Sequence, residues 1–379
     1  MADSGEPLAP ELVVDRAALS PVAQKLLDPG APAPLRQLGA RGVAPGLKPH
    51  EALTVCVLMS QGDDALAPTA RQSLEKLPPP VINGALASPL PAGVLHVVAP
   101  FYAKNPEIAQ KILTHANVHV LTVVEMAAHA SETVAELIAT NEERILTCPQ
   151  IIEKLYMNKQ TRMSTADRLI ELAARHKLTL SIPGFEQAVA AIQGELIAEP
   201  TGERTFDDDL FETAEKLSAE DTSKDDDTHE IDEETGEERV KEEAKARVTV
   251  WSDLNASGKV RRALLGDSKD RMLAIRDSNP VVREAAIKSP GLSENEVVRI
   301  SANRNTGEDI LRVIASDRDW TRAYQIKLNL VTNPRTPFAF GSRLVSFLRE
   351  NDLKKLSNSR DVSGAIQNAV KQHLSRKTK

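Results

Sequence analysis

The sequence predicts an all-α fold, namely an α-solenoid of short stacked helix pairs in two repeat domains joined by a disordered acidic linker. Apolar residues make up 41% of the chain but aromatic residues only 3%, so its cores are aliphatic. Such cores suit stacked helices better than a β-sandwich, whose strands favour aromatic and β-branched residues. The other two observations are a regular recurrence of short amphipathic segments and a strong concentration of acidic residues between residues 207 and 238.

The recurrence runs between Pro80 and Asn158. Helix starts are expected at Asn105, Asn117, Ser131 and Asn141, about 12 residues apart, so a two-helix unit recurs about every 24 residues. Asn and Ser cap the exposed amides of a first helical turn, and Pro106 occupies a position where its missing N–H costs little. Helices this short are marginal alone, so stacked neighbours must supply their stability.

The same plan extends in both directions and defines an N-terminal helical-repeat domain over residues 20–198, preceded by a flexible N-terminus at residues 1–19. Apolar spacing predicts the additional helices, and Pro- and Gly-rich turns separate the earlier ones. The predicted helices cover residues 19–27, 34–42, 50–60, 69–77, 164–176 and 185–197.

Residues 199–247 are interpreted as an acidic disordered linker. Residues 207–238 hold 16 acidic residues and only two lysines, a net charge of −14, and too little apolar surface to offset the cost of ordering. One alternative stays open, because Leu210, Phe211, Ala214 and Leu217 repeat at helical spacing. These four residues would form a short helix that docks on a partner.

Residues 248–379 form the predicted C-terminal basic helical-repeat domain. They carry 24 basic and 14 acidic residues, a net charge of +10, whereas the whole chain has a net charge of −7. Asp277 and Asn279 are expected to cap a helix that Pro280 opens, and further turns begin at Asn303 and Asn333.

At these turns the chain resembles known repeat families. The pattern Asp277-x-x-Pro280-x-x-Arg283-x-x-Ala286 resembles the second helix of a HEAT-type repeat. This resemblance implies a right-handed superhelix of short helices, but it implies little about activity, because such repeats serve many roles.

A second resemblance is to the leucine-rich-variant repeat of bacteria. It covers the stretch from Asn303 through Asp317 and Trp320 to Asn333-Pro-x-Thr-Pro337, although Asn303 and Asn333 lie 30 residues apart and not 24. The likeness implies a bacterial helical-repeat protein. Some members of that family hold an iron–sulfur cluster, which requires a cysteine cluster that two distant cysteines do not provide.

No catalytic, cofactor or metal site is expected, and the chain is interpreted as a non-enzyme. The sequence has no glycine-rich phosphate loop, nucleophile elbow or paired-cysteine zinc motif. His115 and His119 have the spacing of a zinc-binding helix, but the helix start at Asn117 separates them, so their rings are not expected to share a face.

The basic C-terminal domain carries the strongest functional signal, because a basic helical stack can follow a phosphate backbone. The primary functional hypothesis is a non-catalytic scaffold or adaptor that binds protein partners. The alternative is a nucleic-acid-binding helical-repeat protein, and a weaker third option is a HEAT-like enzyme of the DNA glycosylase type. The residues expected to contact a partner or nucleic acid are Arg261, Arg262, Lys269, Arg271, Arg276 and Arg304.

The chain is expected to be cytoplasmic. No stretch approaches the roughly 20 apolar residues that span a bilayer, and the N-terminus has acidic residues without an apolar core. Cys56 and Cys148 lie in apolar surroundings and are expected to be buried, reduced thiols.

Overall fold

The computed structural model describes residues 9–62, 65–193, 203–220, 229–231, 238–240, 242–359 and 362–377. Apart from a two-stranded hairpin, the regular structure in these ranges is helical, which confirms the all-α prediction. The chain divides into two compact units, which we call unit 1 (Met1–Ser181) and unit 2 (Ile182–Lys379).

Unit 1 consists of short helices around an aliphatic core that includes Leu53, Ile82, Ile112 and Ile138. Proline opens several of these helices at the first or second position. The elements are η1 Arg16–Ala18, α1 Pro21–Leu27, α2 Ala33–Ala40, α3 Pro49–Ser60, α4 Ala67–Leu74, α5 Pro79–Leu86, α6 Ala92–Val98, η2 Ala99–Tyr102, α7 Pro106–Leu113, α8 Val120–His129, α9 Glu132–Ala139, α10 Glu142–Thr147, α11 Gln150–Met157 and α12 Met163–Arg175.

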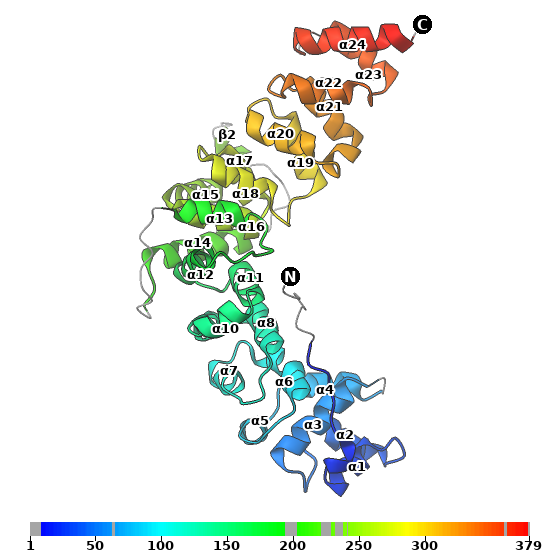
Figure 1. Cartoon of the computed structure of the whole chain (residues 1–379), viewed down its shortest axis with the longest axis vertical. Helices are drawn as coiled ribbons and strands as arrows, with labels where there is room; N and C mark the ends of the chain where they lie inside the picture. The colour runs from blue at the N-terminus through cyan, green and yellow to red at the C-terminus, as the bar shows by residue number, and fades with distance from the viewer. Residues whose placement is uncertain are drawn as a thin grey trace. The chain divides into compact units, whose positions relative to one another are not determined.

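Unit 2 continues with the same short helices, which succeed one another from green α13 to red α24 in Figure 1. Its two strands pair antiparallel, with His229 opposite Val240. The elements are α13 Phe185–Ile192, α14 Phe206–Glu220, β1 His229–Ile231, β2 Glu238–Val240, α15 Glu242–Asp253, α16 Ala256–Leu265, α17 Ser268–Arg276, α18 Pro280–Ile287, α19 Glu294–Ala302, α20 Glu308–Ser316, η3 Trp320–Arg322, α21 Tyr324–Thr332, α22 Phe338–Val345, α23 Glu350–Asn358 and α24 Gly364–Lys377.

Within each unit, many helices pack against their immediate neighbour and against the helix two positions further along the chain. In unit 2 the second kind of contact joins α16 to α18, α18 to α20, α20 to α22 and α22 to α24. In unit 1 it joins α1 to α3, α3 to α5, α5 to α7 and α7 to α9. Contacts between helices two positions apart therefore recur within both units.

Buried asparagines connect successive helix pairs. The Asn158 amide donates to the carbonyl of Ala130 (2.8 Å), and the Asn333 amide donates to the carbonyls of Ser301 (2.9 Å) and Asn303 (3.0 Å). These bonds span 28, 32 and 30 residues, so the expected unit of about 24 residues is too short for these pairs. Each asparagine begins an Asn-x-x-Thr turn, and such turns lengthen the connection between helices.

The division between the units lies earlier than the sequence suggests. The sequence predicts that the helix at residues 185–197 belongs to the N-terminal domain, whereas the corresponding helix α13 packs on α16 and α18 of unit 2. Gln187 of α13 donates to Glu284 (2.9 Å) and accepts a hydrogen bond from Lys288 (3.0 Å), and both partners lie about 100 residues further along. Contacts at that sequence distance are invisible to local periodicity.

The predicted disordered linker does not describe residues 206–220, which form the helix α14. Its start is a reciprocal cap, because the amide of Asp208 donates to Thr205 (3.2 Å) and the amide of Thr205 donates to Asp208 (2.8 Å). Asp207, Asp208 and Asp209 lie in its first turn, where negative charge stabilises a helix. Residues 199–202, 221–228, 232–237 and 241 of the predicted linker lie outside the described residues.

The predicted flexible N-terminus also differs in part. Residues 1–8 lie outside the described range, but Glu11 and Leu12 run against Gly93 at the start of α6. A side-chain carbon at position 93 would stand 2.3 Å from the carbonyl oxygen of Glu11, so only glycine permits this approach. Residues 11 and 12 are therefore part of unit 1.

Candidate partner-binding surfaces

The six residues predicted to contact a partner do not form one surface. Arg261 and Arg262 on α16 have relative exposures of 0%, and Arg271 on α17 is also buried. The prediction that these three residues line a binding surface is therefore corrected. Lys269 is half-buried, whereas Arg276 and Arg304 are exposed, one at the end of α17 and the other in the turn after α19.

Arg262 belongs to a buried charge cluster that joins α14 to α16 and α17. Its guanidinium pairs with Glu215 of α14 and Asp270 of α17, and it also donates to the hydroxyl of Ser218. Arg247 of α15 adds a second cation, with its guanidinium 2.8 Å from Asp267 and 3.3 Å from Asp270. We call the five ionic residues Glu215, Arg247, Arg262, Asp267 and Asp270 the charge cluster.

The ring of Phe211 completes the contact between α14 and α16. The guanidinium carbon of Arg261 lies 4.7 Å from the ring centroid, and that of Arg262 lies 5.7 Å from it. Both distances are within cation–π range, and Phe211 itself is only 3% exposed. The helix of the open alternative is therefore present, and it packs against α16 of the same chain, whereas its docking on a partner stays a prediction.

Arg271 is occupied by a different carboxylate. Its guanidinium makes a two-bond contact with Glu296 of α19, at 3.0 and 3.3 Å, and donates to the carbonyl of Gly266 (2.7 Å). Burial raises the pKa of Glu296, but hydrogen bonds from Arg271 and Ser293 lower it, and the net pKa lies below its ordinary value. Glu296 is therefore held as the anion that a buried arginine requires.

Residues 320–349 of unit 2 form a basic region that is separate from the buried arginines of α16 and α17. Residues 320–349 contain five of the chain's twelve aromatic residues, five basic residues and no acidic residue. Phe338 and Phe347 are 52% and 61% exposed. We call this region the aromatic–cationic surface, and its members are Tyr324, Lys327, Phe338, Phe340, Arg343, Phe347 and Arg349.

Sequence reasoning missed this surface because the charge was averaged over residues 248–379. All acidic residues of that span lie outside residues 320–349. The net positive charge per residue is therefore higher within residues 320–349 than over the whole span. A window that scored aromatic and basic residues together would have found the surface.

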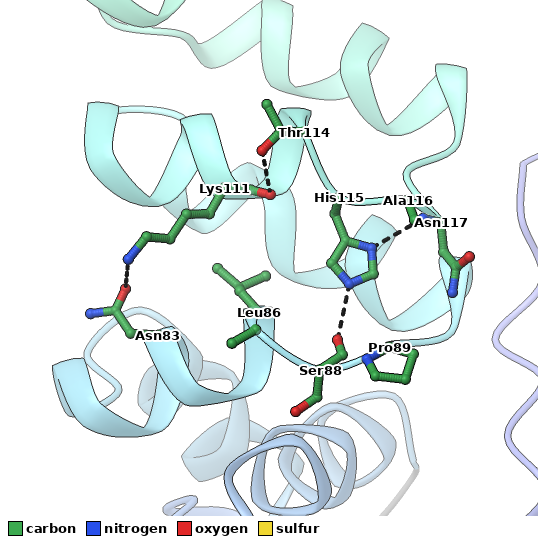
Figure 2. A pocket seen from close by; sticks show the side chains of 10 residues that line it. Asn83, Leu86, Ser88, Pro89, Lys111, Thr114, His115, Ala116 and Asn117 are labelled. Atoms are coloured by element: carbon green, nitrogen blue, oxygen red, sulfur yellow. Dashed lines mark hydrogen bonds between the residues drawn. The ribbon is translucent and has the colours of Figure 1, made fainter.

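Unit 1 offers an open groove of about 530 Å³ between the C-terminal ends of α5 and α7. Figure 2 shows Leu86 between the Lys111–Asn83 pair and the ring of His115. We call this the α5–α7 groove, and its lining residues are Asn83, Leu86, Ala87, Ser88, Pro89, Lys111, Thr114, His115, Ala116 and Asn117.

Hydrogen bonds fix the two walls of the α5–α7 groove to each other. Lys111 donates to the side-chain oxygen of Asn83 (2.7 Å), and Asn117 donates to the carbonyl of Leu90 (2.9 Å). The Nδ1 atom of His115 accepts from the amide of Asn117, so its Nε2 carries the proton and donates to the carbonyl of Ser88 (3.1 Å). The groove is therefore largely preformed, as ligand sites usually are.

The same bonds occupy the histidines that the sequence places at zinc-binding spacing. Both ring nitrogens of His115 are engaged, and Nδ1 of His119 accepts from the amide of Leu121 (3.3 Å) as a helix cap. Among the residues that the structure describes, no group of three or more His, Cys, Asp or Glu side chains is arranged to hold a metal ion.

Both cysteines are buried and unpaired with each other, as the sequence predicts. Burial raises the pKa of the Cys56 thiol to about 12, and this thiol lies near the carbonyls of Ala40 and Ala70. A neutral buried thiol is a poor nucleophile, so Cys56 serves the core of unit 1.

In the described part of the chain, no helix has the length and hydropathy needed to cross a bilayer.

Comparisons of this chain with protein-family models, with curated proteins and with solved structures find no match.

Proposed function

We propose that this chain is a non-catalytic adaptor whose helix pairs form an α-solenoid of HEAT-like or leucine-rich-variant-like repeats and bind segments of partner proteins. Support for the repeat arrangement comes from the packing of alternate helices on one another, from α1 to α9 and from α16 to α24, and from the asparagine bonds that span 28 to 32 residues. Support for the function comes from the α5–α7 groove.

The chemistry of the α5–α7 groove favours an extended protein segment as its occupant. Leu86, Pro89 and Ala116 provide apolar surface, while neutral amide and hydroxyl groups around them can bond the N–H and C=O groups of a peptide backbone. Lys111 is the single cationic side chain among the lining residues. The C-terminal ends of α5 and α7 carry partial negative charge, so a phosphate backbone is disfavoured there.

Filling the α5–α7 groove is expected to remove partner binding. Ala87 and Ala116 line the groove and are exposed, so Ala87→Trp and Ala116→Trp add volume in the groove without disturbing the core. The full chain serves as bait in cell extract, and mass spectrometry quantifies each protein recovered at moderate salt. A partner bound in the groove should be recovered at least about tenfold less with either variant, because a lost contact of 1.4 kcal/mol already weakens binding tenfold.

The matched control is Ala33→Trp, which adds the same side chain to an exposed position on α2. This variant should recover the partner as the wild type does. Equal recovery with the filled and open grooves would show that the groove is not the binding site, and the absence of any partner specific to the wild type would contradict the adaptor proposal.

A further inference from the structure

The aromatic–cationic surface is the most unusual exposed feature of unit 2. The chain has seven phenylalanines, and three of them stand within ten residues on α22 and the turn that follows it. Phe338 and Phe347 expose half or more of their area to solvent, at 52% and 61%. Phe347 is the more exposed of the two, and it lies among cations, because Lys327 approaches its ring and Arg349 follows it by two residues.

Cations already lie over the rings of this surface. The Arg349 guanidinium carbon is 4.4 Å from the centroid of Tyr324, and the Lys327 ammonium is 6.0 Å from that of Phe347. Arg343 lies 5.5 Å from the centroid of Phe340, one helical turn away on α22. Positive charge is therefore held beside each of three aromatic rings.

The backbone fixes this arrangement. α21 and α22 pack on each other, as Figure 1 shows, and the turn after α22 is closed by the bond from the amide of Phe347 to the carbonyl of Leu344 (3.0 Å). The hydroxyl of Tyr324 accepts from the amide of Arg349 (3.0 Å) and donates to Asp352. Tyr324 therefore connects α21 to the start of α23 and holds its ring under Arg349.

Such a surface has three candidate anionic partners: an acidic protein segment, a nucleic-acid duplex and a single-stranded nucleic acid. The exposed rings distinguish between these partners. The face of an aromatic ring carries negative potential, so exposed rings do not attract the carboxylates of an acidic protein segment. The bases of a duplex are stacked inside it and cannot reach a ring on a protein surface. Unpaired bases stack on any aromatic ring, while their phosphates need neighbouring cations.

We infer that the aromatic–cationic surface binds single-stranded nucleic acid, with a base stacked on Phe347 and phosphates near Lys327, Arg343 and Arg349. This inference is independent of the adaptor proposal, because it concerns unit 2 and a different class of partner. It also places the nucleic-acid site on exposed residues of α21 and α22 instead of on the buried arginines of α16.

The test measures the binding of the full chain to a fluorescent single-stranded oligonucleotide of about 16 nucleotides by anisotropy, as a function of salt. Phe347→Ala should weaken binding about tenfold, because it removes the stacking ring. Lys327→Ala should lower the slope of log affinity against log salt by about 0.7, the value for one phosphate contact on a single strand. Phe347 is exposed and Lys327 is half-buried, so the urea midpoint should change little with either variant.

Two matched controls separate this site from general charge attraction. Phe206→Ala removes a ring that is 73% exposed on the acidic helix α14, and Arg276→Ala removes an exposed cation on α17. Both variants should bind as the wild type does. Absence of binding at low salt, equal affinity for a duplex of the same length, insensitivity to Phe347→Ala, or tighter binding of an acidic peptide would each overturn the inference.

Discussion

Replacing Asp270 by alanine is expected to lower the free energy of unfolding of unit 2 by about 3–5 kcal/mol. Asp270 is buried, and it pairs with the fully buried Arg262, lies 3.3 Å from Arg247 and accepts from Ser218 (3.0 Å). Its removal takes one shared anion from two cations that have little access to water. The loss of stability reflects uncompensated buried charge more than the intrinsic strength of the ion pair.

Urea unfolding followed by tryptophan fluorescence measures this effect in the full chain, because both tryptophans, Trp251 and Trp320, lie in unit 2. Asp270→Asn keeps the size and one hydrogen-bonding oxygen, so its loss should be intermediate. Asp253→Ala, at an exposed position in the last turn of α15, should change stability by less than about 0.5 kcal/mol. An unfolding midpoint of Asp270→Ala equal to that of the wild type would contradict the charge cluster.

The second large effect is expected from Phe211→Ala. It should lower the free energy of unfolding of unit 2, α14 included, by about 3–5 kcal/mol. The Phe211 ring is 3% exposed and lies against both arginines of α16, so its removal leaves a cavity and two guanidinium groups without their aromatic neighbour. If α14 detaches before the rest of unit 2 unfolds, the loss will appear as protease cleavage within residues 206–220.

Phe206→Ala is the matched control, because it removes the same side chain from the same helix at a position that is 73% exposed. It should leave both the urea midpoint and the protease resistance of α14 unchanged. Equal behaviour of the two variants would show that Phe211 does not anchor the helix.

The helices were predictable because their signals are local. Asn105, Asn141 and Pro106 mark helix starts through contacts within one turn, and the structure places α7 and α10 directly after them. The apolar spacing of Leu210 and Phe211 likewise indicated a helix within the acidic stretch. The low apolar content of this acidic stretch predicts disorder, because the sequence alone does not show that α16 offers a surface on which α14 can pack.

The binding residues were harder to predict because burial of a charged side chain depends on distant partners. Arg262 is enclosed through Glu215, which lies 47 residues earlier, and Gln187 reaches Glu284 across 97 residues. Counting basic residues in the C-terminal domain therefore pointed to arginines that face inward. The exposed alternative at residues 320–349 becomes evident only when the buried and paired cations are set aside.

The docking of α14 against α16 is the central claim, because this docking encloses Arg261 and Arg262. Hydrogen–deuterium exchange on the full chain tests it most directly. The amides of residues 210–219 should exchange with protection similar to that of α16, because local opening of α14 requires breaking the Phe211 and Glu215 contacts. Exchange of these amides at the rate of an unfolded peptide, while α16 stays protected, would show that α14 is not docked and would return the arginines of α16 to the surface.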